Sequence, residues 1–301
     1  QDGQLTRVEA ERLVSFTSSS NPLFIFGAVS VGFFLNPELG ILLALSHYAS
    51  NIGVGLVMRF YGRKEEKKQL EEQGQNKPFS VLEAFKAMHR TRLKDTRPFG
   101  KILGEAVSSS VHTLLMIGGF IIIFSVINKV LFLLHITAFV AGLFSSVFSF
   151  LSLSQSLSIP FITGLFEMTL GSQLTSQVEN TTLMQQAIIT SSLLAFSGFS
   201  IQAQVASILA ETDIRFRPFF MARLLQTLLS GLITWLLFNP VYIGLRNRSQ
   251  NSNVEETFSP GHGTAIDILG FLSHNGAVIT LISLMAYCFY LLYAYGQSTH
   301  K

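Results

Sequence analysis

Between residues 102 and 210 the chain carries only four charged side chains: Glu105, Lys129, Glu167 and Glu179. A stretch this long and this poor in charge cannot form the surface of an ordinary soluble domain, in which about 25% of residues are charged. The whole chain of 301 residues shares the bias, with 13% charged and 49% hydrophobic residues and a mean hydropathy of +0.43. We therefore expect an all-α polytopic membrane protein, because helices satisfy their own backbone hydrogen bonds in lipid.

Positive charge is concentrated in one segment. Twelve of the 21 Lys and Arg residues lie within residues 59–101, together with six acids. This enrichment is typical of a cytoplasmic loop that follows the positive-inside rule. Within it, residues 79–93 place apolar side chains near helical spacing, as in a helix lying at the membrane interface. Nucleic-acid binding is disfavoured, because acids are interspersed with the basic residues and aromatic side chains are not.

Apolar stretches near the length that crosses a bilayer, about 20 residues, occur at residues 39–60, 102–128, 130–150, 181–210, 219–238 and 265–295. A further apolar stretch up to residue 35 is interrupted by the sequence SSSNP at residues 18–22, where proline removes a backbone donor. With a re-entrant hairpin predicted for residues 151–177, this makes roughly seven spans plus one hairpin.

One of the four acids, Glu167, stands inside the apolar sequence IPFITGLFEMTLG at residues 159–171. A charge at the bilayer centre costs about 2.5–3.5 kcal/mol on insertion scales, so such a residue usually faces a cavity. Pro160, Gly164 and Gly171 predict a broken segment, and the glycines would expose backbone N–H groups that attract anions. Glu167 is a candidate to bind solute or a coupling proton, since burial disfavours a charged carboxylate. The alternative is a polar cap at the hairpin tip.

A second polar cluster interrupts the apolar stretch 181–210. It consists of a glycine followed by polar side chains, Gly198, Ser200, Gln202 and Gln204. An unwound backbone with amide side chains is a good hydrogen-bonding partner for a polar solute. Ser and Gln also join helices in membrane bundles, so a structural role stays open.

Two other groups are candidates. Arg223 lies near the start of an apolar span and could clamp a carboxylate bidentately. Snorkelling to the headgroups, or an ion pair with Asp213, is the alternative. Glu105, Ser108 and His112 share a helical face that could line a water-filled path, with Glu105 or His112 as ion-coupling residues, or could simply hydrogen-bond to another helix.

A thin internal similarity relates the two ends of the membrane region. Asp2 precedes Arg12 by ten residues, as Asp213 precedes Arg223, and ERLV at residues 11–14 resembles ARLL at residues 222–225. Weak repeats of this kind are typical of inverted-repeat transporters.

The sequence lacks the residue patterns that metal binding, common enzyme mechanisms and nucleotide binding require. The histidines show no metal-ligand spacing with acids or with the single cysteine, Cys288, so we predict no metal site. No catalytic triad, phosphate loop or dinucleotide fingerprint is present. We therefore predict that the protein is not an enzyme and uses no cofactor.

Four long segments of the chain resemble one family: LTRVEAERLVSF (residues 5–16) with SNPLFIFG (20–27), IPFITGLFEMTLG (159–171), SGFSIQAQ (197–204) and TDIRFRPFFMAR (212–223). They are similar to the stage V sporulation integral membrane proteins of endospore-forming Firmicutes, part of the nucleoside-recognition (Gate) group, whose architecture is related to concentrative nucleoside transporters.

The resemblance implies a transporter of dipicolinic acid in the outer forespore membrane, needed for dipicolinate loading and spore cortex formation. It implies residues 1–60 as the C-terminal part of a first membrane repeat and 61–101 as the basic loop. Residues 102–245 would be a second, Gate-type repeat, and 246–301 a polar loop with a last transmembrane helix. Members of the family are longer at the N-terminus and this chain begins with Gln1, so we expect an upstream part of the first repeat.

Three functions stay open at this point. The favoured one is a carrier for a small polar anion such as dipicolinate; the others are a nucleoside-type permease and a non-transporting scaffold for spore envelope assembly. The expected partners are the solute and the lipid bilayer, with a coupling proton or sodium. Assembly into a homo-oligomer is left undecided, and no nucleic acid is expected.

Overall fold

A computed structural model of the protein describes residues 5–63, 96–247 and the isolated positions 85–86, 89–90, 92 and 285. The chain divides into two compact units, Gln1–Ser249 and Gln250–Lys301, and the description that follows concerns the first. The predicted interfacial helix at residues 79–93 lies mostly outside the described residues, as does the predicted last span at 265–295.

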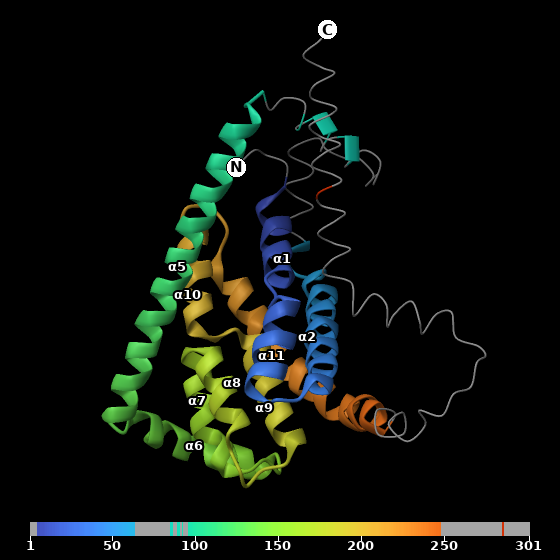
Figure 1. Cartoon of the computed structure of the whole chain (residues 1–301), viewed down its shortest axis with the longest axis vertical. Coiled ribbons are helices and arrows are strands. Elements are labelled where there is room, and N and C mark those ends of the chain that lie inside the picture. The colour runs from blue at the N-terminus through green and yellow to red at the C-terminus, as the bar shows by residue number, and fades with distance from the viewer. Residues whose placement is uncertain are drawn as a thin grey trace, which may run out of the picture. The chain divides into compact units, whose positions relative to one another are not determined.

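The elements assigned among the described residues are all helical (Figure 1). In chain order they are α1 (Arg7–Thr17), the π-helix η1 (Phe24–Phe33), α2 (Pro37–Met58), α5 (Phe99–Leu133), α6 (Ile136–Phe150), the short 3₁₀ turn η2 (Gln155–Leu157), α7 (Ser158–Phe166), α8 (Met168–Ser176), α9 (Leu183–Phe196), α10 (Gly198–Leu209), α11 (Phe216–Leu237) and the π-helix η3 (Phe238–Ile243).

Four helical segments of the described residues are long and apolar enough to cross a membrane: Pro37–Met58, Phe99–Leu133, Leu183–Leu209 and Phe216–Asn247. The predicted spans at 39–60 and 181–210 are therefore confirmed with small shifts of their ends, and the span predicted at 219–238 is present but extends to Asn247. The protein is an all-α polytopic membrane protein, as its composition predicts.

The predicted division of residues 102–150 at Asn128 is wrong. α5 continues through Asn128 to Leu133 as one helix of 35 residues, and the chain turns at His135, whose φ is 58°. Asn128 does not break the helix because its side-chain amide donates to Thr163 O on α7, 3.0 Å away, instead of competing for its own backbone. The following α6 has 15 residues, about 22 Å of helix, which is less than the hydrocarbon thickness of about 30 Å.

A similar difference occurs at Asn239-Pro240, where we predicted that a span would end. The helix instead continues as η3, a π-helical turn. Its i→i+5 pattern is the wider relative of the α-helix, and it carries the chain past a residue that lacks a backbone N–H.

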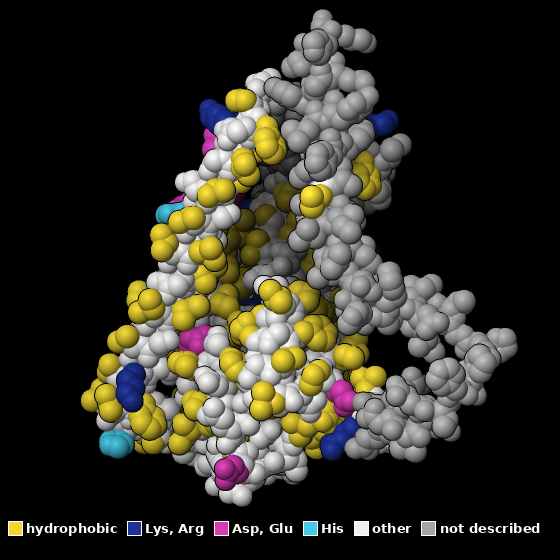
Figure 2. Space-filling model, viewed as in Figure 1, with side chains coloured by type: hydrophobic (Ala, Val, Ile, Leu, Met, Phe, Trp, Pro, Cys, Tyr) yellow, Lys and Arg dark blue, Asp and Glu magenta, His cyan; other side chains and the backbone are white. Residues whose placement is uncertain are grey.

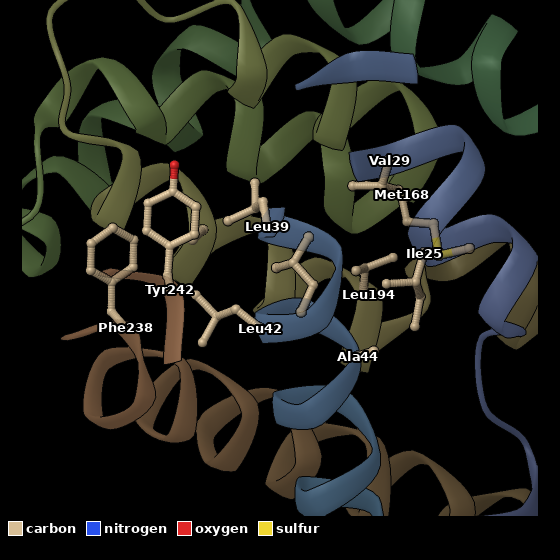
Figure 3. Close-up of a cluster of buried hydrophobic side chains, with 11 residues drawn as sticks. Ile25, Val29, Leu39, Leu42, Ala44, Met168, Leu194, Phe238 and Tyr242 are labelled. Atoms are coloured by element: carbon tan, nitrogen blue, oxygen red, sulfur yellow. The ribbon is translucent and has the colours of Figure 1, made fainter. Parts of the chain in front are cut away.

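The main apolar core lies where η1, α2, α9 and η3 meet (Figure 3). Leu39 and Leu42 of α2 face Phe238 and Tyr242 of η3 on one side, and Ile25 and other η1 side chains on the other. α5 contributes little to the interior. Its side chains are mostly exposed, with Asn128 as its buried residue, and hydrophobic side chains cover the face in view (Figure 2). Such an apolar exterior suits contact with lipid.

Candidate functional site

The segment 158–176 forms a helical hairpin. α7 and α8 pack against each other on either side of Glu167 (Figure 1). The packing is closest at two glycines: a Cβ atom added to Gly171 would lie 2.1 Å from the Cα of Gly164. The two helices can approach so closely only because neither position has a side chain. Gly164 and Gly171 therefore allow the close packing of the broken segment, while their contact with a solute stays a prediction.

Glu167 forms the tip of this hairpin. Its backbone is extended (φ −142°, ψ 110°) and separates the two helices. Its carboxylate oxygens accept from the backbone N–H groups of Thr169 (3.0 Å) and Leu170 (2.8 Å), and the residue is 2% exposed. The acid thus caps α8, where the helix dipole favours a negative charge. This is the structural alternative foreseen for Glu167, and it accounts for a carboxylate in an apolar segment.

A second break separates α9 from α10. Ser197 and Gly198 both have left-handed backbone conformations, with φ of 70° and 67°. A serine in this region is strained and a glycine is not. The rings of Phe196 and Phe199 flank the break and pack edge to face, with centroids 5.3 Å apart. The unwinding predicted near Gly198 is therefore present.

The two breaks touch each other. A Cβ atom added to Gly198 would lie 3.1 Å from Met168 N and 3.3 Å from Phe166 O, so the left-handed turn sits directly against the hairpin tip. Phe199 also packs on Phe166, with ring centroids 5.6 Å apart. Gly198 therefore packs directly against the backbone on either side of Glu167.

A cavity of about 380 Å³ lies beside this contact. Its lining combines the hairpin tip, the 197–198 break, two residues of α5 and a polar segment that follows α1. The lining residues are Ser18, Ser19, Ser20, Asn21, Phe24, Ile117, Ile121, Glu167, Met168, Thr169, Ser197, Ile201 and Gln204. Non-helical backbone from the hairpin tip, the 197–198 break and residues 18–21 thus faces one cavity. Within a membrane, non-helical backbone is tolerated where it lines such a cavity.

We name residues 18–21, between α1 and η1, the 18–21 linker. Side chains of α2 hold it: His47 Nε2 accepts from Ser20 N–H at 3.1 Å, and the Tyr48 hydroxyl donates to Ser20 O at 2.9 Å. Asn51 donates to Phe16 O at the end of α1. Because Nε2 of His47 is an acceptor here, the ring is neutral and carries its proton on Nδ1.

Arg223 lies against the last turn of α1, just before the linker, and is fully buried. Its Nη2 donates to Ser15 O in the last turn of α1, at 2.7 Å, and its guanidinium lies 5.2 Å from the ring centroid of Phe219. A cation at the carboxyl end of a helix is favourable. Nε and Nη1 have no hydrogen-bond partner within residues 5–63 and 96–247. Arg223 neither snorkels nor pairs with Asp213, which is exposed, and it is absent from the cavity lining.

The predicted polar cluster on α10 divides into two roles. Gln204 lines the cavity, and its Nε2 donor has no partner among the described residues. Gln202 instead donates to Phe196 O at 3.1 Å and so satisfies the end of α9. Ser200 is fully buried and does not line the cavity. Within this cluster, Gln204 is the side chain positioned to reach a solute.

The remaining ion-coupling candidates lie elsewhere. Glu105 pairs with Arg97 near the start of α5, and both Glu105 and His112 are exposed. The structure does not bring either residue to the cavity. Among the described residues no group of three or more His, Cys, Asp or Glu side chains could hold a metal ion.

The sequence reasoning missed the 18–21 linker as part of the site. It noted SSSNP only as an interruption, although a polar break in an apolar stretch is the same signal that pointed to residues 197–204. It also missed the pair Glu11–Arg215, in which Arg215 Nε lies 2.8 Å from Glu11 Oε1. Burial alone would raise the pKa of Glu11, but hydrogen bonds from Arg215 and Tyr61 and the charge of Arg215 hold that pKa below its usual value.

Comparison with known proteins is consistent with this geometry. Residues 114–214 match the Gate family, described as nucleoside recognition. The chain is 48% identical to the sporulation integral membrane protein YlbJ of Bacillus subtilis (strain 168), in an alignment that covers 100% of this chain and 73% of that protein. No solved structure matches the chain.

Proposed function

Since this chain belongs to the family of the sporulation integral membrane protein YlbJ, we propose that it is a carrier that acts in a spore-forming bacterium during sporulation. Its cargo would be a small organic anion, dipicolinic acid in the first place. Transport across the outer forespore membrane would load the spore and support cortex formation. The membrane location follows from the four apolar helical segments long enough to span a bilayer.

The observation that carries this proposal is the contact between the two backbone breaks beside a common cavity. Gly198 packs against the hairpin tip, and both breaks line the hollow together with the 18–21 linker. Broken helices at the substrate site are a recurrent design of secondary transporters. A scaffold for envelope assembly has no need of such a cavity, so the carrier is favoured over the scaffold.

The cavity suits a flat, polar ring. A volume of about 380 Å³ lies within the range of ligand sites, roughly 300–1,000 Å³. Ile117, Ile121 and Ile201 provide apolar faces, while the linker hydroxyls and the free amide donor of Gln204 provide hydrogen-bonding groups. Dipicolinate has this combination of an aromatic ring and oxygen acceptors at its edge.

A neutral nucleoside is a second candidate. The described residues that line the cavity include one charged side chain, Glu167, and no Lys or Arg. An anion would therefore meet a carboxylate, unless a proton or sodium ion accompanies it. A nucleoside needs no such compensation, and residues 114–214 match a nucleoside-recognition family.

Flux measurements in proteoliposomes separate the functions. The full-length protein would be tested with labelled dipicolinate and labelled uridine under proton and sodium gradients. Glu167→Gln should reduce flux of the true solute strongly, because it weakens the cap of α8 and alters the cavity wall. Glu179→Gln is the matched control, since Glu179 is an exposed acid that does not line the cavity. Flux of uridine alone would favour the permease, and flux of neither solute would favour the scaffold.

A further inference from the structure

The interior of the described protein holds few formal charges. Its buried acids and guanidinium groups are Glu11, Glu167 and Arg223. Glu11 is neutralised by Arg215 at the start of α11. This leaves one negative and one positive side chain: Glu167, which lines the cavity, and Arg223, which bonds the end of α1 just before the 18–21 linker.

Among the described residues Arg223 has no acidic partner of its own. Its guanidinium donates there to the carbonyl of Ser15, and Nε and Nη1 find no acceptor in that part of the chain. A buried cation without a counter-charge is costly. A carbonyl oxygen and an aromatic face offset only part of that cost, so the positive field of Arg223 extends to its surroundings.

That field reaches the cavity through the 18–21 linker. Arg223 holds Ser15 O at the end of α1, and the residues that follow form the cavity wall. Each break joins the carboxyl end of one helix to the amino end of the next. The helix dipoles place about −0.5 of a unit charge at the first end and about +0.5 at the second, so the two largely cancel at each break. The formal charges that decide the local potential are therefore those of Glu167 and Arg223.

We propose that Arg223 is a specificity-determining residue that acts without touching the solute. By balancing Glu167 from the last turn of α1, just before the linker, it makes the cavity acceptable to an anion. Without it the site would carry a net negative charge and prefer a neutral solute. This inference rests on the proposed function for the identity of the solutes, and it differs from the direct carboxylate clamp expected from sequence.

Binding to the purified full-length protein tests this independently of flux. Affinities for dipicolinate and for uridine would be measured for the parent, Arg223→Gln and Arg223→Lys. Arg223→Gln should weaken the binding of dipicolinate relative to that of uridine by on the order of tenfold. Arg223 bonds Ser15 O, and the lining residue Ser18 follows three residues later, at most roughly 10 Å along the chain. A unit charge at about that distance in a medium of effective dielectric 20 has an effect of this size. Arg223→Lys keeps the charge and should keep the ratio. Arg12→Gln is the control, because Arg12, in the middle of α1, donates to Tyr61 O beyond the end of α2 and does not line the cavity.

The possible results separate the two ideas. If the parent binds dipicolinate without transporting it, and Arg223→Gln lowers the dipicolinate-to-uridine ratio, the charge role stands and the carrier function fails. If Arg223→Gln and Arg223→Lys weaken the binding of both solutes equally, Arg223 only stabilises the position of α1 and the inference is overturned. A parent that binds neither solute would refute both.

Discussion

The glycine contact inside the hairpin allows a quantitative prediction. In Gly171→Ala, the new methyl group would lie 2.1 Å from Gly164 Cα and 2.6 Å from Gly164 N, while ordinary contact begins near 3.4 Å. The atoms in the way belong to the backbone, so no side-chain rotation can relieve the clash. α7 and α8 must therefore move apart by about 1.3 Å at this point.

The cost follows from two opposing terms. Overpacking a well-packed interior costs typically about 1–3 kcal/mol, and a clash with backbone belongs at the upper end. Replacing a helical glycine by alanine returns roughly 1 kcal/mol of helix propensity. We expect Gly171→Ala to destabilise the protein by about 2 kcal/mol.

Apparent melting temperatures of the purified variants in one detergent measure this effect. Gly118→Ala is the matched control, because Gly118 lies on α5 with nothing within 4 Å of its added methyl group, and it should be neutral or slightly stabilising. Gly164→Ala should fall between the two, since its methyl group meets the flexible end of Leu193. If Gly171→Ala melts at or above the parent, the close packing of the hairpin is wrong.

Three other substitutions test separate contacts by the same melting assay. Glu11→Gln should cost about 1–3 kcal/mol at neutral pH; because the folded pKa of Glu11 is lowered from 4.5, the ion pair stabilises above that pH, and the difference from the parent should vanish as pH falls through the lowered pKa. A difference that grows on acidification would contradict the ion pair. Asn128→Leu should cost about 1 kcal/mol by removing the donor to Thr163 O; no loss would mean that α5 does not anchor the hairpin. Gly198→Ala should cost about 1–2 kcal/mol because φ is 67°, whereas Ser197→Gly should be neutral or stabilising, and the reverse order would refute the left-handed turn.

Composition and local sequence were sufficient for the all-α membrane class, for the helical hairpin and for the break near Gly198. The charge-poor stretches identified the spans, and Pro160, Gly164 and Gly198 identified the hairpin and the broken helix. These signals are local, because a proline, a glycine or a polar run in an apolar segment disfavours a continuous helix whatever surrounds it.

The parts that sequence did not predict depend on distant partners. His135 adopts a left-handed conformation that nothing in its neighbours requires. The hydrogen-bond acceptor of Arg223 lies 208 residues away in the sequence. It is a backbone carbonyl, and every residue has one, so the amino-acid sequence does not reveal the pair. Asn128 resembles a helix breaker until Thr163 O is placed beside it. Tertiary contacts decided the cases of Arg223 and Asn128.

The backbone contact between Gly198 and the hairpin tip has a mechanical consequence. Main-chain atoms cannot rotate out of each other's way, so α7–α8 cannot move closer to α9–α10 at this point unless α9–α10 moves as well. A carrier built in this manner would shift all four segments together in that direction. The bending that exposes the cavity to one side of the membrane and then to the other would then occur on either side of these segments, in the turn around His135 and in residues 210–215.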